Sequence, residues 1–364
     1  MQKGGTWTMA ATLQTIADEL GVSRSTVSNA YSRPDQLSPD LRARILEAAE
    51  RLGYPGPNPT ARSLRRGKVN AIGVLLTDNL SMAFTDPYAV EYLRGLAEAA
   101  SARETSLLLI NLPKDEEAGR RVVSNAAVDA FCLYCVPDWH GALDLIRTRG
   151  VPIVIGEDPN AFGPDASYVG INERAAARRL GEHIVKLGHR DIAIVAHWIV
   201  DSGVTGVVSA DPDGLRYYVT GERVRGFRDA FVAAGLPWER VTLINAANNH
   251  RDEGAAGAAH ALDRLDRATA VLTTSDVLAL GVLDALRVRG LTPGRDVSVT
   301  GFDNIPDAEV NGLTTIRQPS VERGRLAGEL LLDPPEDPAR RRLTLPVSLV
   351  VRATTGPNPS KELP

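Results

Sequence analysis

Residues 12–31 read TLQTIADELGVSRSTVSNAY, and their order of capping, apolar and turn residues specifies the structure of the amino-terminal part of the chain. Thr12 is a capping residue, and the apolar residues after it recur at the spacing of a helix that ends at Gly21. Glycine adopts the left-handed conformation that a tight turn requires, and Ser23 then caps a second helix. A small residue, a glycine and a branched apolar residue at this spacing predict a helix-turn-helix, with key positions Ala17, Gly21 and Val27.

A third helix is expected to begin at Ser38-Pro39, a capping residue followed by a first-turn proline, and to end before Gly53. The predicted domain covers residues 10–57. Its second helix is polar on the outer side, and serine and threonine there suit donation to phosphates and base edges better than helix formation. A three-helix bundle without a DNA role is the alternative, but it leaves this polar face unexplained. We therefore predict a DNA-reading face formed by Thr12, Ser23, Arg24, Ser25, Thr26, Ser28 and Asn29.

Residues 54–68, YPGPNPTARSLRRGK, are expected to link this domain to the rest of the chain. The prolines forbid a helix through residue 59, but Asn58 with Pro59 is suited to open a short helix over residues 60–66. A helix of two turns is marginal in water, so it should order only on DNA or against a partner. The apolar Leu64 stands among arginines, which is what a wedge into the minor groove flanked by phosphate contacts needs.

The charge of the chain is unevenly distributed. The net charge is -4, but residues 1–70 carry +4 and the remainder carries -8. A basic head on an acidic body favours nucleic-acid binding by the head alone. No apolar run reaches the ~18–20 residues that span a bilayer, and the first twenty residues lack the features of a signal peptide. We therefore expect a soluble cytoplasmic protein without a membrane partner.

From Val69 onward, strand-like apolar runs alternate with amphipathic helical stretches. This alternation predicts an α/β body, with parallel sheets covered by helices on both faces. The number of units exceeds one sheet's usual size, so two sheets in tandem are expected. The expected strands are 71–76, 107–112, 130–136, 152–155, 192–196, 241–245, 270–273 and 297–301, and the clearest helices are 87–103, 173–187, 222–234, 252–266 and 276–289.

The motifs of common enzyme classes are missing from the sequence. There is no phosphate-binding glycine loop, no His-Glu-x-x-His and no Gly-x-Ser-x-Gly, and the six histidines are scattered. Cys132 and Cys135 fall in a predicted strand, where residues three apart point to opposite faces and do not share a metal, so we expect two buried core cysteines. We predict no catalytic activity, no metal and no cofactor, but a ligand crevice at the ends of the parallel strands.

The segments TLQTIADELGVSRSTVS, LSPDLRARILEAAERLGY and NPTARSLRRG resemble the LacI/GalR (lactose-repressor) family of transcriptional regulators, and the resemblance covers nearly the whole chain. It implies that Arg24, Ser25 and Asn29 read the major groove and that Leu64 enters the minor groove between paired hinge helices. The implied DNA contacts of the linker, residues 58–68, are Asn58, Ala61, Arg62, Leu64 and Arg65.

For the body, the resemblance implies two subdomains like those of periplasmic binding proteins, clasping one small-molecule effector within residues 69–356. The expected amino-terminal subdomain comprises about 69–158 and 319–345, and the carboxyl-terminal one about 159–318 and 346–356. The matching segments are AIGVLL (71–76), GHRDIAI (188–194), RVRGF (223–227), GFDN (301–304) and VVRATT (350–355).

The resemblance implies that the effector is a sugar or related polyol, and an arginine fork and a carboxylate give directional bonds to hydroxyl groups or an acid group. By position, Arg223 and Asp303 are the main effector contacts. The alternatives are a surface helix arginine for Arg223 and a loop-bracing role for Asp303. Further candidates are Phe84, Asp86, Tyr134, Ser275 and Gln318.

The chain departs from the family pattern at residues 197–221, where a short loop is usual. Within this segment, Tyr217 and Tyr218 are placed either to close over a ligand or to anchor the loop. The tail, residues 356–364, has no heptads, so the tetramer-forming extension of some members is missing and a homodimer is expected.

The sequence as a whole therefore predicts a regulator, expected to be a repressor, that binds double-stranded operator DNA under effector control. The first alternative is a solute-binding protein without a DNA function, which would need a secretory signal. The second is a sugar-modifying enzyme, which would need a catalytic constellation.

Overall fold

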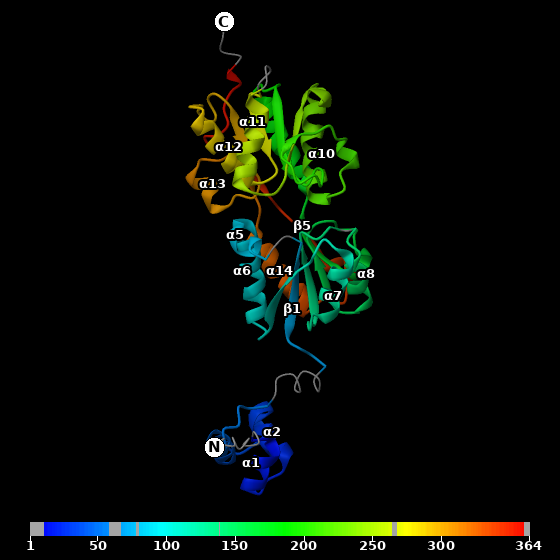
Figure 1. Cartoon of the computed structure of the whole chain (residues 1–364), viewed down its shortest axis with the longest axis vertical. Helices are drawn as coiled ribbons and strands as arrows, with labels where there is room; N and C mark the ends of the chain where they lie inside the picture. Colours follow the sequence, from blue (N-terminus) through cyan, green and yellow to red (C-terminus); the bar gives the residue numbers. More distant parts are fainter. Residues whose placement is uncertain (1–10, 58–66, 78–79, 138, 264–267, 360–364) are drawn as a thin grey trace, which may run out of the picture. The chain divides into compact units, whose positions relative to one another are not determined.

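The computed structural model describes residues 11–57, 67–77, 80–137, 139–263 and 268–359. The chain divides into two units, a head up to Val69 and a body from Asn70 onward (Figure 1). The predicted linker contacts Asn58, Ala61, Arg62, Leu64 and Arg65 lie outside the described residues. Among the residues that are described, no helix has the length and apolar character to cross a membrane.

The head is the predicted helix-turn-helix domain. It consists of α1 (Leu13–Leu20), α2 (Arg24–Ser32), a 3-10 turn (Pro34–Gln36) and α3 (Pro39–Arg51). The Thr12 side chain accepts a hydrogen bond from the Thr15 amide, and Gly21 ends α1 with φ of 66°. The three helices bury one small core, made of Ile16, Ala17, Val27, Ala30, Ile45, Ala48 and Ala49.

The body has two lobes, each built on a mainly parallel sheet, as predicted. The first lobe carries a six-stranded sheet in the order β12-β5-β4-β3-β1-β2. Its strands are β1 (Ala71–Leu76), β2 (Ser106–Asn111), β3 (Ala130–Tyr134), β4 (Ile153–Ile155), β5 (Ser167–Ile171) and β12 (Arg342–Leu345). Its helices are α5 (Met82–Thr85), α6 (Pro87–Ser101), α7 (Glu116–Asn125), α8 (Ala142–Thr148) and α14 (Ser320–Leu332), with 3-10 turns at Gly163–Asp165 and Pro338–Arg341.

The second lobe carries a five-stranded sheet in the order β10-β9-β6-β8-β7, with only β7 antiparallel to its neighbour. Its strands are β6 (Ile192–His197), β7 (Gly206–Val207), β8 (Thr242–Ala246), β9 (Ala270–Thr273) and β10 (Ser298–Thr300). Its helices are α9 (Glu173–Lys186), α10 (Tyr218–Ala233), α11 (Arg251–Leu262), α12 (Asp276–Val288) and α13 (Pro306–Val310), with 3-10 turns at Pro212–Gly214 and Trp238–Arg240. A separate antiparallel pair joins β11 (Thr315–Arg317) to β13 (Ser348–Val350).

The crossing from the first lobe to the second differs from the predicted boundary. Because β5 pairs with β4 and β12, the chain leaves the first lobe after Ile171, and not near residue 158. The sequence SYVGI of β5 was missed as a strand because its serine and glycine interrupt the apolar run, although every residue in it is buried. The chain crosses twice more, between β11 and α14 and between β12 and β13.

Each lobe packs pairs of helices through glycines at the crossing point. In the first lobe, a Cβ added to Gly95 of α6 would overlap the carbonyl oxygen of Val321 in α14. A Cβ added to Gly324 of α14 would overlap the carbonyl oxygen of Tyr92 in α6. The backbones therefore approach more closely than any side chain would allow. In the second lobe, α11 and α12 cross in the same way at Gly254 and Gly281.

Replacing Gly324 by alanine is expected to lower the free energy of unfolding of the body by about 1–3 kcal/mol, the usual effect of overpacking a close-packed interface. Urea denaturation followed by circular dichroism measures the effect. Gly214→Ala is the matched control, because a Cβ at Gly214 meets nothing within 4 Å. A loss of stability for Gly324→Ala no larger than that of the control would show that α6 and α14 separate at little cost.

Candidate functional site

The outer side of α2 presents the polar residues that were predicted to read DNA. Arg24 and Ser25 are exposed, and the remaining three, Thr26, Ser28 and Asn29, are half-buried. Ser23 has a local role as well, because its Oγ accepts a hydrogen bond from the Thr26 amide at 3.0 Å and caps α2. Helix amino termini with exposed hydroxyl groups are suited to phosphate contacts.

The second site is a cleft between the two lobes of the body. Its residues come mostly from segments that follow the carboxyl ends of parallel strands, where ligands bind in open α/β sheets. The first lobe contributes Asp86, Tyr88, Tyr92, Tyr134, Cys135, Gly156, Glu157 and Arg323. The second lobe contributes Glu173, His197, Tyr217, Val219, Arg223, Asn249, Ser275 and Asp303.

Arg223 lies in the wall of this cleft and is almost fully buried. Its Nε donates to Glu173 Oε2 at 2.7 Å, and its Nη1 donates to the carbonyl oxygen of Thr274. Its guanidinium carbon lies 3.7 Å from the centre of the Phe302 ring, and Nη1 lies 3.9 Å from Asp303 Oδ1. The exposed surface arginine that was the alternative at this position is therefore not what the structure contains.

Asp303 lines the cleft beside Arg223, in a backbone conformation with φ of 128°. Burial raises the pKa of Asp303 well above its usual range, although the Arg223 guanidinium opposes this shift. Gln318 was predicted as an effector contact, but it does not line the cleft. Instead its Nε2 donates to Asp303 Oδ1 at 2.7 Å, and its Oε1 accepts from Tyr88 Oη at 3.3 Å. Gln318 therefore orients two cleft residues from behind.

A chain of hydrogen bonds runs from one lobe to the other across the cleft. Asp86 caps α6, with Oδ1 accepting from the Tyr88 amide, and its Oδ2 accepts from Asn249 Nδ2 at 3.1 Å. Ser275 Oγ in turn donates to Asn249 Oδ1. Burial raises the pKa of Asp86. Two of the predicted residues, Asp86 and Ser275, thus meet on Asn249, which the sequence analysis did not single out.

Of the two aromatic residues predicted to contact the effector, one lines the cleft and the other does not. Tyr134 is buried in the cleft wall with its ring 5.1 Å from that of Tyr92. Phe84, in contrast, is 70% exposed and does not line the cleft, so its prediction as a stacking platform is wrong for this structure. The reason is local: α5 is a single turn that buries Ala83 and leaves Phe84 on its outer side.

The long segment 197–221 supplies part of the cleft wall. Tyr217 is buried and lines the cleft, and its ring also packs edge-to-face on Trp198 at 4.4 Å. The packing on Trp198 agrees with the anchoring alternative for Tyr217, and closure over a ligand stays a prediction. The prediction for the cysteines is half right, because Cys132 is buried whereas Cys135 is half-buried and lines the cleft.

Several cleft residues were not found by sequence reasoning. Glu157, His197 and Asn249 each lie at or just after the end of a parallel strand, and that position was the available signal. Burial lowers the pKa of His197 to about 3, so this ring is neutral at physiological pH. Arg323 gave no such signal, because it lies within α14. Its Nε donates to the carbonyl oxygen of Val169 at 3.0 Å and Nη1 donates to the Tyr88 hydroxyl at 2.6 Å.

Comparison with known proteins decides the family. Residues 12–58 match the model of bacterial regulatory proteins of the lacI family, and residues 182–355 match a periplasmic binding protein-like domain. An HTH-type transcriptional regulator of Mycolicibacterium smegmatis is 41% identical over 357 residues, covering 95% of this chain and 97% of the relative. The chain belongs to the LacI family.

Solved structures of LacI-family regulators agree with this assignment. A regulator from Corynebacterium glutamicum superimposes with a TM-score of 0.73 at 35% identity, covering 96% of this chain and 100% of that one. The regulator CelR in complex with cellobiose gives a TM-score of 0.65 at 26% identity, with coverages of 94% and 99%. This LacI-family chain is therefore a DNA-binding transcriptional regulator, and the alternative of a solute-binding protein without a DNA function is not supported.

Proposed function

We propose that this regulator is a homodimeric repressor whose affinity for its operator is set by a small polyhydroxylated effector bound between the lobes. One observation supports the proposal: hydrogen-bonding side chains and tyrosine rings from both lobes line a single cleft. A ligand that bonds to both lobes stabilises their closed arrangement, and this differential binding is what moves a regulator between two states. We further propose that the protein has no catalytic activity and acts in the cytoplasm, where its DNA target lies.

The polarity of the cleft favours a neutral polyol over an anion. Four carboxyl groups line it, those of Asp86, Glu157, Glu173 and Asp303, against the two guanidinium groups of Arg223 and Arg323. A phosphorylated or acidic effector would meet two guanidinium groups that already donate to protein oxygens, whereas hydroxyl groups donate readily to carboxyl oxygens. The cellobiose bound by CelR lends support to a sugar.

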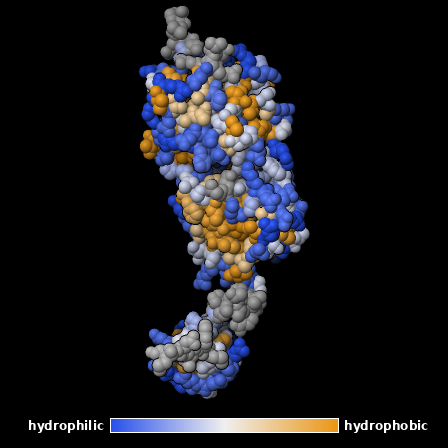
Figure 2. Space-filling model, viewed as in Figure 1, coloured by the Kyte–Doolittle hydropathy of each residue, from blue (hydrophilic) through white to orange (hydrophobic). Residues whose placement is uncertain are grey.

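A dimer is proposed because two operator half-sites need two reading heads. The first lobe also exposes a broad apolar area on the face seen in Figure 2. Exposed apolar side chains of this lobe include Val90 in α6 and Leu108 in β2. Contiguous apolar surface of this kind is typical of a protein–protein interface.

Thermal-shift measurements on the whole chain test the effector class. Neutral sugars and cyclic polyols form one panel, and sugar phosphates and organic acids form the other. A ligand at a hundred times its dissociation constant should stabilise the body by about 2.7 kcal/mol. The same ligand should change operator affinity in a mobility-shift assay. Stabilisation by phosphorylated sugars alone would contradict the neutral polyol.

Arg24→Ala is expected to weaken binding to the preferred operator by about 1–3 kcal/mol, the range for a side chain that reads a base. Arg24 is exposed at the first turn of α2, where it is free to enter the major groove. Fluorescence anisotropy with operator and random duplexes measures the two affinities. Equal losses on the two duplexes would make Arg24 a phosphate contact and not a base reader.

Leu64→Ala is expected to reduce both operator affinity and DNA bending, while effector binding stays unchanged. Leu64 lies outside the described residues, so this prediction rests on an apolar residue flanked by Arg62, Arg65 and Arg66 in the sequence. A gel assay with circularly permuted operator fragments measures the bend. An unchanged bend in the variant complex would exclude the wedge role.

A further inference from the structure

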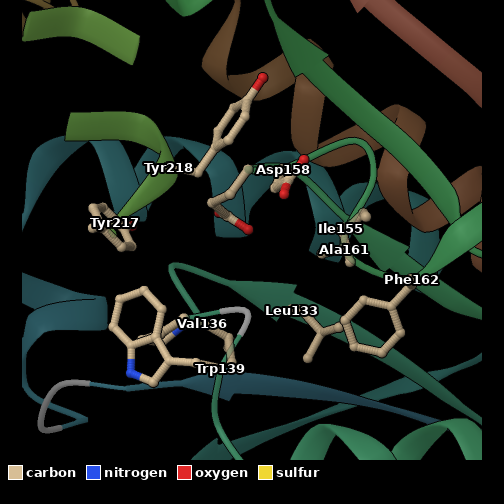
Figure 3. Close-up of a pocket in the computed structure, with 11 residues that line it drawn as sticks. Leu133, Val136, Trp139, Ile155, Asp158, Ala161, Phe162, Tyr217 and Tyr218 are labelled. Atoms are coloured by element: carbon tan, nitrogen blue, oxygen red, sulfur yellow. The ribbon is translucent and has the colours of Figure 1, made fainter. Parts of the chain in front are cut away.

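A second, smaller pocket lies directly beside the effector cleft. The two share Glu157 and Tyr217 in their linings, so they form adjoining compartments. Figure 3 shows Trp139 and Tyr217 at one end of this pocket and Leu133 and Phe162 at the other. The complete lining is Leu133, Val136, Pro137, Trp139, Ile155, Glu157, Asp158, Ala161, Phe162, Tyr217 and Tyr218. No part of the proposed function above uses this pocket.

The lining differs in character from that of the cleft. The inner part consists of apolar side chains from β3, β4 and the loops after them, with Leu133 and Ile155 buried and Phe162 half-buried. The two carboxyl groups, of Glu157 and Asp158, come from the segment next to the cleft, and each already accepts a backbone hydrogen bond. A sugar hydroxyl placed among the apolar side chains would lose its hydrogen bonds with water and gain none, which is unfavourable. The interior therefore suits an apolar group.

The aromatic end of the pocket is built jointly by the two lobes. Trp139 belongs to the first lobe, and the guanidinium carbon of Arg216, from the second lobe, lies 4.5 Å from the centre of its ring. Lys114 and Asp201 make a further ion pair of 3.0 Å between the same two regions. Arg216, Tyr217 and Asp201 all belong to the segment 197–221. This segment thus supplies the part of the pocket wall that comes from the second lobe.

We propose that this pocket receives an aromatic ring joined to the polar effector in the cleft, so that the effector is an aryl glycoside and not a free sugar. The inference rests on the proposed function, because the sugar part must occupy the cleft. The aromatic side chains in the pocket wall are suited to pack against an aromatic ring of the ligand, in an offset-stacked or edge-to-face arrangement. A ring in this position contacts both lobes and adds to the stability of their closed arrangement.

Calorimetry with matched ligands tests the proposal on the full-length chain. The probes are phenyl and methyl D-glucosides, galactosides and xylosides, in both anomers, with free phenol as a control. For any sugar that binds, the phenyl glycoside should bind roughly 10- to 100-fold more tightly than the methyl glycoside, as burial of one ring predicts. Phenol alone should bind weakly, because it lacks the cleft contacts.

Two variants test whether the phenyl ring of the ligand binds in this pocket. Ala161→Trp fills the pocket from a half-buried loop position and should remove the phenyl advantage while methyl glycoside binding is retained. Trp139→Ala removes a wall whose side chain is 43% exposed, so folding is little affected, and should also reduce the advantage. Ala233→Trp is the matched control, because Ala233 is exposed at the far end of α10 from Tyr217 and Tyr218.

The outcomes separate the two proposals. Equal binding of phenyl and methyl glycosides would overturn the aromatic pocket and leave the sugar-binding cleft standing. A phenyl advantage that survives in both Ala161→Trp and Trp139→Ala would place the ring elsewhere and would also overturn it. If no member of the panel binds or changes operator affinity, both the sugar effector and the pocket proposal fail.

Discussion

Replacing Arg223 by alanine is expected to lower the free energy of unfolding of the body by about 3–5 kcal/mol and to abolish effector binding. The reason for the loss of stability is Glu173, the buried residue with which Arg223 pairs. Glu173 is only 4% exposed, and Arg223 Nε is its hydrogen-bond donor at 2.7 Å. Without the arginine, a buried carboxylate remains without a compensating charge. Thermal denaturation of the full chain and calorimetry with an identified effector measure the two losses.

A control variant on the same helix, α10, separates the effect of breaking a buried ion pair from the effect of removing a positive charge. Arg228 pairs with Asp213 at 2.8 Å, but Asp213 is 62% exposed, so Arg228→Ala should cost no more than about 1 kcal/mol. Effector recognition is isolated by combining Arg223→Met with Glu173→Gln, which removes both charges and should recover most of the stability. If this double variant bound the effector as tightly as the unmodified protein, Arg223 would have only a structural role.

Arg323→Ala is expected to cost about 2–5 kcal/mol of stability, because it leaves several buried acceptors without a donor. Arg323 donates from α14 to the carbonyl oxygens of Gly156 and Val169 and to the Tyr88 hydroxyl. These contacts join the end of β4 and the middle of β5 to α6, at the cleft.

Arg325 offers a matched control two positions along α14. Its guanidinium pairs with Glu322 and Glu329, both about half exposed. Exposed ion pairs on a helix contribute little, so Arg325→Ala should change the free energy of unfolding by less than about 1 kcal/mol. Urea denaturation of the two variants side by side makes the comparison. Similar losses for both would mean that the buried contacts of Arg323 contribute no more than surface pairs.

Much of the head could be predicted from sequence because its signals are local. A capping hydroxyl at Thr12, a glycine at position 21 and a cap at Ser23 each act within one helical turn, and the structure contains all three. The strands β1 and β9 were predicted to the residue, since a buried parallel strand reads as a mainly apolar run. Family resemblance placed Arg223 and Asp303, and both line the cleft.

Other features could not be predicted because their partners are distant in sequence. The strand β5 has no apolar run of its own, and it is a strand because β4 and β12 lie on either side of it. Phe84 was expected in the cleft, but the direction of its side chain depends on how one turn of helix packs. Arg323 resembles any helix arginine until α14 is placed against β4 and β5.

The sequence by itself thus determined the family, the helix-turn-helix and the alternation of strands and helices, because caps, turns and hydrophobic periods act between near neighbours. Only the tertiary structure decided which side chains share the cleft. In the structure, Gln318 donates to Asp303 and does not line the cleft. Arg223 pairs with Glu173, which lies fifty residues earlier in the chain. The tertiary structure also assembled an aromatic pocket from Trp139 and Tyr217, which lie on different lobes. The physical reason is that burial and charge pairing depend on positions in space, which the folding of both sheets brings about together.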